Sequence, residues 1–177
     1  MALRNDVFVV FALIFLLFCA GCITGTGDDS QPVKTQISDM DCLETLDKVA
    51  KGISVTTRNF RGYSQQWESK GLSDPEYTNS LRRFESGYAQ IIEFMKSNEN
   101  ITGCDLRYSD AKNLLVESSK SYEKATTGVL DYLGSGSDKA SRDRVLLEDV
   151  VDELDVADGY FEKATAELQR RQKELSD

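Results

Sequence analysis

Apolar residues recur at intervals of three and four along most of this 177-residue chain, and this spacing constrains its fold more than any other feature. Such steps place side chains on one face of an α-helix, whereas a half-buried β-strand requires alternation. Proline, which interrupts helices, occurs only at Pro32 and Pro75. The sequence therefore predicts an all-α fold.

Four apolar series follow one another after residue 38, separated by turn and capping residues. The first keeps one face through residues 43–67, although Thr57 and Ser64 occupy two of its positions. Gly71 is expected to end the first helix, and Ser73-Asp74-Pro75 to begin the second. Because helices joined by short loops prefer antiparallel neighbours, residues 39–177 are expected to form an up-down-up-down four-helix bundle with a long C-terminal helix.

Glycine occurs inside each of the predicted helices, where it costs up to about 1 kcal/mol relative to alanine. The positions are Gly52, Gly62, Gly87, Gly128 and Gly159. Close approach of neighbouring helices is the expected reason for them, and a mobile or kinked bundle is the alternative.

The chain begins with a charged segment followed by an unbroken apolar run, which is the layout of an export signal. Arg4 precedes the apolar residues 7–20, and the run ends in Ala20-Gly21-Cys22. These three residues resemble the lipobox of prokaryotic (bacterial or archaeal) membrane lipoproteins, although Cys19 stands where leucine is usual. The resemblance covers the N-terminal segment only. It implies that Cys22 carries a thioether-linked lipid and becomes the mature N-terminus.

An uncleaved membrane anchor is the alternative, because residues 7–23 reach the lower limit of roughly 17 residues for a membrane-spanning helix. In either case residues 1–21 are the signal or anchor, and residues 22–38, rich in Gly, Ser, Thr and Asp, form a flexible linker. Arg4 favours the cytoplasmic side and Asp28 and Asp29 the other side. The bundle of residues 39–177 is therefore expected at the extracytoplasmic face of the membrane.

The cysteine count becomes an even pair once this signal is set aside. Cys19 leaves with the signal and Cys22 carries the lipid, so Cys42 and Cys104 remain. In an oxidising compartment this pair is expected to form a disulfide, with two separate thiols as the alternative. In an up-down bundle both positions fall at the end that carries the linker, as a bridge requires.

The absence of histidine excludes Ser-His-Asp and Cys-His nucleophiles and the di-iron sites of ferritin-like bundles. Two cysteines alone cannot complete a zinc site, so no metal and no cofactor is expected. A net charge of −9 argues against a nucleic-acid partner. The acidic run over residues 148–158 is interpreted as a solvated helix face, answered across the bundle by Arg58, Arg61, Arg82 or Arg83, with weak calcium binding as the alternative.

Three further features suggest sites. Trp67, Tyr77 and Tyr132 are expected near the membrane-distal end, where they mark a candidate pocket or partner surface, although ordinary core packing is the favoured explanation for them. Arg170, Arg171 and Lys173 are expected to extend back toward the membrane end, as a solvated helix terminus or in contact with lipid headgroups. Asn100-Ile101-Thr102 is an N-glycosylation sequon in a predicted loop.

These features predict a non-enzymatic, membrane-tethered scaffold or partner-docking module of the cell envelope, with a protein partner and no defined oligomeric state. The alternative is an extracytoplasmic ligand-sensing or solute-binding bundle. Its architecture is similar to the four-helix sensor domains of chemoreceptors, and it would signal through a partner protein.

Overall fold

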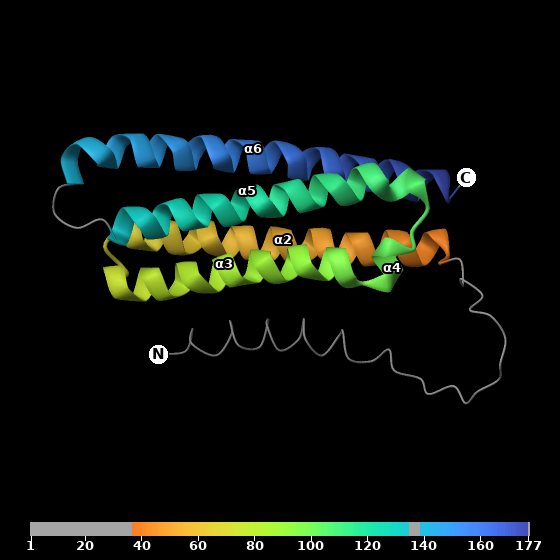
Figure 1. Ribbon diagram of the computed structural model, residues 1–177, viewed down its shortest axis with the longest axis horizontal. Coiled ribbons are helices and arrows are strands. Elements are labelled where there is room, and N and C mark those ends of the chain that lie inside the picture. The colour runs from red at the N-terminus through yellow and green to blue at the C-terminus, as the bar shows by residue number, and fades with distance from the viewer. Residues whose placement is uncertain (1–36, 135–138, 177) are drawn as a thin grey trace, which may run out of the picture. The chain divides into compact units, whose positions relative to one another are not determined.

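The computed structural model describes residues 37–134 and 139–176, without the side chains of residues 139–147. Its four long helices are α2 (Asp39–Glu68), α3 (Asp74–Ser97), α5 (Ser109–Gly134) and α6 (Lys139–Glu174). Two short elements, α4 (Glu99–Thr102) and the 3₁₀ turn η1 (Leu106–Tyr108), connect α3 to α5 (Figure 1). No strand occurs in these two ranges, and the all-α prediction is confirmed. The predicted signal and most of the linker, including Cys22, lie outside the described residues.

The long helices lie side by side in one helical bundle (Figure 1). α5 packs against both α6 and α3, while α2 packs against α3 and less extensively against α6. The core between them is apolar, and Leu46, Ile53, Leu81 and Leu115 are fully buried in it. Among the described helices, none has a stretch long and apolar enough to cross a membrane.

The turn after α2 differs from the prediction in one residue. The helix ends at Glu68, and the residue with left-handed backbone is Lys70, with φ of 59°, rather than Gly71. Gly71 is needed for a different reason: its N–H donates to the Gln66 carbonyl at 2.7 Å, and a Cβ would lie 3.2 Å from that oxygen. Glycine thus permits a close backbone approach here.

The segment between α3 and α5 is more ordered than the sequence suggested. Asn100 was expected in a loop, yet α4 forms there and η1 follows it, and the two elements bury Ile101 and Tyr108. Elements of three or four residues are too short to display a helical period, which explains why the pattern did not indicate them.

The two polar positions on the apolar face of α2 each meet a tyrosine hydroxyl of α3. Thr57 Oγ1 lies 3.0 Å from Tyr88 OH, and Ser64 Oγ lies 2.7 Å from Tyr77 OH. Buried hydroxyl groups need such partners to offset their lost hydration. These residues are therefore part of the helix interface, not interruptions of it.

Close helix packing explains only one of the four interior glycines whose surroundings are defined. A Cβ at Gly128 would lie 2.8 Å from Val150 Cγ2, so α5 and α6 approach closely there. At Gly52, Gly62 and Gly159 an added Cβ would meet nothing within 4 Å. The expectation of close packing is wrong at these three positions, which face open space.

Alanine substitutions should separate the two kinds of glycine. Gly62→Ala is expected to raise the free energy of unfolding by roughly 0.5–1 kcal/mol, because it restricts the unfolded chain and improves helix propensity without a clash. Gly128→Ala is expected to lower it by roughly 1–3 kcal/mol, because the stiff Val150 side chain must move. Urea unfolding followed by circular dichroism measures both. Equal shifts for the two variants would contradict this assignment.

Candidate functional site

Cys42 and Cys104 form the predicted disulfide, with their Cα atoms 5.7 Å apart. The bridge links the first turn of α2 to the segment between α4 and η1. Two further contacts strengthen the same junction: Arg107 forms a 3.0 Å ion pair with Asp39, and Tyr108 OH donates to the Asp39 carbonyl at 3.2 Å. The start of α2 is thus fixed to the α3–α5 connection at three points.

Asn100 lies at this end, in α4, and its side chain is exposed. Its backbone N–H donates to Asn98 Oδ1 at 2.9 Å, an N-terminal capping contact. Glycosylation of Asn100 stays a prediction.

Trp67, Tyr77 and Tyr132 come together at the other end of α2, as expected. Trp67 stacks on Tyr77 with ring centroids 4.9 Å apart, and Tyr132 meets Trp67 edge-on at 6.4 Å. The indole Nε1 donates to Asp74 Oδ1 at 2.8 Å. Tyr77 is buried, so the three rings form a packed aromatic cluster.

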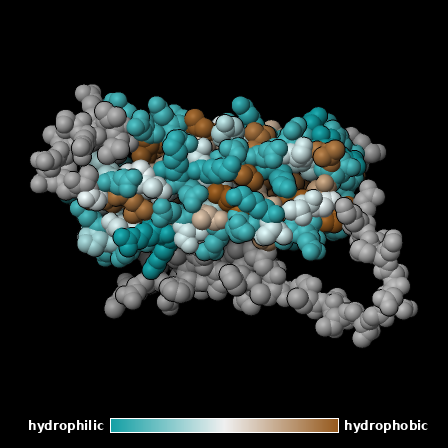
Figure 2. All heavy atoms as spheres, viewed as in Figure 1, coloured by the Kyte–Doolittle hydropathy of each residue, from teal (hydrophilic) through white to brown (hydrophobic). Residues whose placement is uncertain are grey.

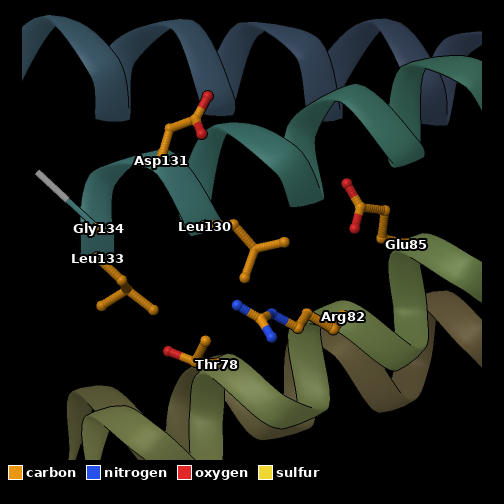
Figure 3. Close-up of a pocket in the computed structure, with 7 residues that line it drawn as sticks. All are labelled: Thr78, Arg82, Glu85, Leu130, Asp131, Leu133 and Gly134. Atoms are coloured by element: carbon orange, nitrogen blue, oxygen red, sulfur yellow. The ribbon is translucent and has the colours of Figure 1, made fainter.

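A shallow surface pocket of about 520 Å³ lies beside this cluster, between α3 and α5 (Figure 3). None of the three aromatic residues lines it. Its lining consists of Thr78, Arg82, Glu85, Leu130, Asp131, Leu133 and Gly134. Figure 3 shows the Arg82 guanidinium reaching between Leu130 and Thr78. The pocket therefore combines leucine side chains with the Arg82 cation and the Glu85 carboxylate, whereas the Asp131 carboxylate points away from Arg82 toward α6 (Figure 3).

A polar network crosses the middle of the bundle and includes residues from all four long helices. Thr57 and Tyr88 share a hydrogen bond, and the Tyr88 ring stacks on Tyr122 with centroids 5.4 Å apart. Tyr122 OH donates to Asp158 Oδ1 at 2.5 Å. Asp158 Oδ2 in turn pairs with Arg61 at the bundle surface. The network thus runs from a buried hydroxyl to a half-exposed ion pair.

The electrostatics of the network follow from burial. Burial raises the pKa of Tyr88 well above its ordinary value, opposed by its hydrogen bond to Thr57 and by the Arg61 charge. The pKa of Tyr122 is also raised strongly, first by burial and then by its hydrogen bond to the Asp158 carboxylate. Both hydroxyl groups therefore stay protonated and act as donors or acceptors, not as bases.

These raised values predict a loss of stability in alkali. Tyr88 and Tyr122 keep their protons in the folded chain, whereas an unfolded tyrosine ionises near pH 10. Since the unfolded state binds fewer protons above that pH, the stabilising contribution is complete below about pH 10 and falls as the pH rises further. In an alkaline titration, the tyrosinate absorbance of Tyr88 and Tyr122 should appear at a higher pH in the folded chain than in the chain unfolded in urea. Coincident titrations would contradict the assignment.

Cations from other helices form ion pairs with two carboxylates of the acidic run on α6. Arg61 pairs with Asp158, and Lys124 pairs with Glu153 at 2.5 Å and lowers its pKa. Arg58, Arg82 and Arg83 form no ion pair with the described part of α6. Asp152 and Asp155 remain exposed, and the described ranges contain no group of three side chains suited to a metal.

The basic residues near the end of α6 bind carboxylates of their own helix. Glu167 accepts from Arg170 at 2.5 Å and from Arg171 at 2.9 Å, and Glu174 lies 3.0 Å from Arg171. The Arg170 and Arg171 charges, which were interpreted first as a solvated helix terminus and only alternatively as lipid contacts, are thus largely balanced within the last turns of the helix.

The sequence predicted that Arg61 could pair with the acidic run, as it does with Asp158, but it did not reveal the hydrogen bond between Tyr122 and Asp158. Tyr122 had been placed on the packing face and Asp158 in a solvated acidic run. The signal available was that Asp158 follows Ala157, a residue of the packing face.

Comparisons of the chain with protein-family models, curated proteins and solved structures give no match.

Proposed function

We propose that the chain is a non-enzymatic scaffold of the cell envelope, tethered to the extracytoplasmic face of the membrane and built as an antiparallel up-down-up-down four-helix bundle. The lipobox-like residues Ala20-Gly21-Cys22 support lipid attachment at Cys22, with an uncleaved anchor as the alternative. The predicted linker would then hold residues 39–177 close to the bilayer.

The antiparallel arrangement is supported by contacts at the two ends of α2. Its first turn is bridged to the α3–α5 connection through Cys42 and Cys104. Its last turn meets the last turns of α5 through Trp67 and Tyr132. Arg61 reaches Asp158, which lies near the middle of α6. Helix directions that alternate along the chain satisfy all three contacts with short connections.

The polar network is the observation that carries the scaffold proposal. Thr57, Tyr88, Tyr122 and Asp158 come one from each long helix, and two hydrogen bonds and one ring stack link them in series. The disulfide adds a covalent link at one end. A bundle held in this way presents its outer faces in fixed positions, which suits a docking platform.

The outer face of α6 is the surface that we propose for a protein partner. Val151 and Val156 are 55% and 47% exposed, and the exposed carboxylates of Asp152 and Asp155 lie beside them. Valines surrounded by carboxylates would fit a segment whose apolar residues are flanked by Lys or Arg.

Photo-crosslinking in native membranes tests this function. A photoreactive residue at Val151 is expected to capture one reproducible protein partner, whereas the same residue at the exposed position Gln90 of α3 should not. Recovery of the chain without a partner from the Val151 position would contradict the scaffold. Mass spectrometry of the mature N-terminus tests the tether, because an intact Met1 or Ala2 would exclude lipidation of Cys22.

The pocket beside Arg82 is the observation that favours the alternative, a ligand-sensing or solute-binding bundle. A ligand that binds the native state raises the melting temperature as its concentration rises. If the chain is a scaffold that binds no such ligand, a screen with small organic anions should leave its melting temperature unchanged. A concentration-dependent rise that Arg82→Gln abolishes would support the sensor instead.

A further inference from the structure

The disulfide end of the bundle exposes apolar side chains that nothing in the described residues covers. Leu106, in η1, is 86% exposed, and Met40, in the first turn of α2, is 60% exposed. They flank the same ion pair, since Asp39 precedes Met40 and Arg107 follows Leu106. Leu175, after the end of α6, is 38% exposed. The hydrogen bond from the Arg107 N–H, followed by the Arg107 charge, lowers the pKa of the Asp105 carboxyl most strongly. Arg171, four residues before Leu175, lies close enough to Asp105 for its positive charge to help lower that pKa.

Leu106 is held rigidly, because its neighbours on both sides are bound. Cys104 is disulfide-bonded, Asp105 accepts from the Arg107 N–H at 2.9 Å, and Tyr108 binds α2. An exposed apolar side chain on a fixed turn loses little conformational freedom when it is buried by a partner.

This end is also the one where the chain enters the bundle from its N-terminal segment. Ile37 packs against Gly103, since a Cβ on that glycine would lie 2.6 Å from Ile37 Cδ1. Only the 14 residues 23–36 separate this point from Cys22. For a flexible linker this length corresponds to an average span of about 20 Å. α2, with 30 residues, is about 45 Å long, so the opposite end of the bundle lies well beyond that span.

We infer that Leu106 and Met40 insert into the lipid surface and orient the tethered bundle with its disulfide end on the membrane. This docking rests on the proposed tether, which brings the apolar side chains to the bilayer at high effective concentration. Arg107 pairs with both Asp39 and Asp105, and Arg170 and Arg171 pair with Glu167 and Glu174. Exposed carboxylates of the neighbouring segments, at Asp41, Glu99 and Asp110, add further negative charge, so this end offers no basic surface for anionic lipid. The attraction is therefore apolar and needs no anionic lipid.

Tryptophan quenching by lipid tests the docking in the full-length chain. The native Trp67 lies 27 residues along α2 from Met40, a distance of about 40 Å, and should not be reached by acyl chains. In phosphatidylcholine vesicles brominated on the acyl chains, the tryptophan introduced by Leu106→Trp is expected to lose most of its fluorescence. The matched control Val151→Trp, exposed on the side of the bundle, should keep its fluorescence. Neither raised salt nor added phosphatidylglycerol should change the result.

Each other outcome overturns a defined part of this inference. If the chain floats with the vesicles but Leu106→Trp is not quenched, the docking fails and the tether stands. If Val151→Trp is quenched as well, the bundle lies on its side. If quenching requires phosphatidylglycerol and disappears in salt, the attraction is electrostatic. If the chain does not float at all, the tether itself is wrong. Unchanged circular dichroism spectra of both variants confirm that each one is folded.

Discussion

Replacing Cys42 and Cys104 together by alanine should lower the free energy of unfolding of the bundle by about 4 kcal/mol. The bridge closes a loop with a sequence separation of 62, and the chain-entropy model assigns about 4 kcal/mol to a loop of that length. For a domain of this size, 1 kcal/mol corresponds to roughly 2–4 °C, so the melting temperature should fall by roughly 10–15 °C. Thermal unfolding of the detergent-solubilised full-length chain measures the change.

Reduction provides the matched control for this prediction. Reductant should lower the melting temperature of the parent chain to near that of the double variant, and should leave the variant unchanged. Because Cys42 is fully buried, alanine at that position also loses some packing, so the reduced parent should remain slightly more stable than the variant. A parent chain that melts at the same temperature with and without reductant would show that the bridge contributes little.

Asp158→Ala should lower the free energy of unfolding by about 2 kcal/mol. The buried Tyr122 hydroxyl would lose its acceptor, which costs about 1–3 kcal/mol when no replacement is available. The ion pair with Arg61 adds at most about 1 kcal/mol, because its two side chains are 49% and 36% exposed and water screens them. Urea unfolding with circular dichroism detection is the appropriate measurement.

Asp155→Ala is the control for Asp158→Ala, because this carboxylate lies one turn earlier on the exposed face of α6. It should change the free energy of unfolding by less than about 0.5 kcal/mol. Tyr122→Phe should have an intermediate effect of about 1 kcal/mol, because Asp158 keeps Arg61 as its partner. If Asp158→Ala and Asp155→Ala have equal effects, the network does not stabilise the bundle.

The network shows why the side-chain chemistry of this bundle was harder to predict than its helices. Thr57 and Ser64 were recognised as polar residues on an apolar face, but nothing local indicates that Tyr88 and Tyr77 lie opposite them. Asp158 was assigned to solvent because it belongs to an acidic run, although one of its oxygens reaches Tyr122. Such pairs join residues 13 to 36 positions apart, so they depend on how whole helices are placed.

The aromatic cluster gives the opposite case. Trp67, Tyr77 and Tyr132 were expected at one end because each lies near the end of a helix and the loops are short. Their rings do meet there. The pocket, however, lies beside the cluster and is lined by none of these residues, and Tyr77 is buried in the core.

The sequence alone determined the helical content, the four long helices and the Cys42–Cys104 pair, because local period, capping residues and cysteine count carry that information. The tertiary arrangement was needed for the rest. It placed Tyr122 against Asp158, left Gly52, Gly62 and Gly159 facing open space, and exposed Leu106 on a rigid turn. Each of these properties depends on the distance between elements remote in the chain, which helix periodicity does not specify.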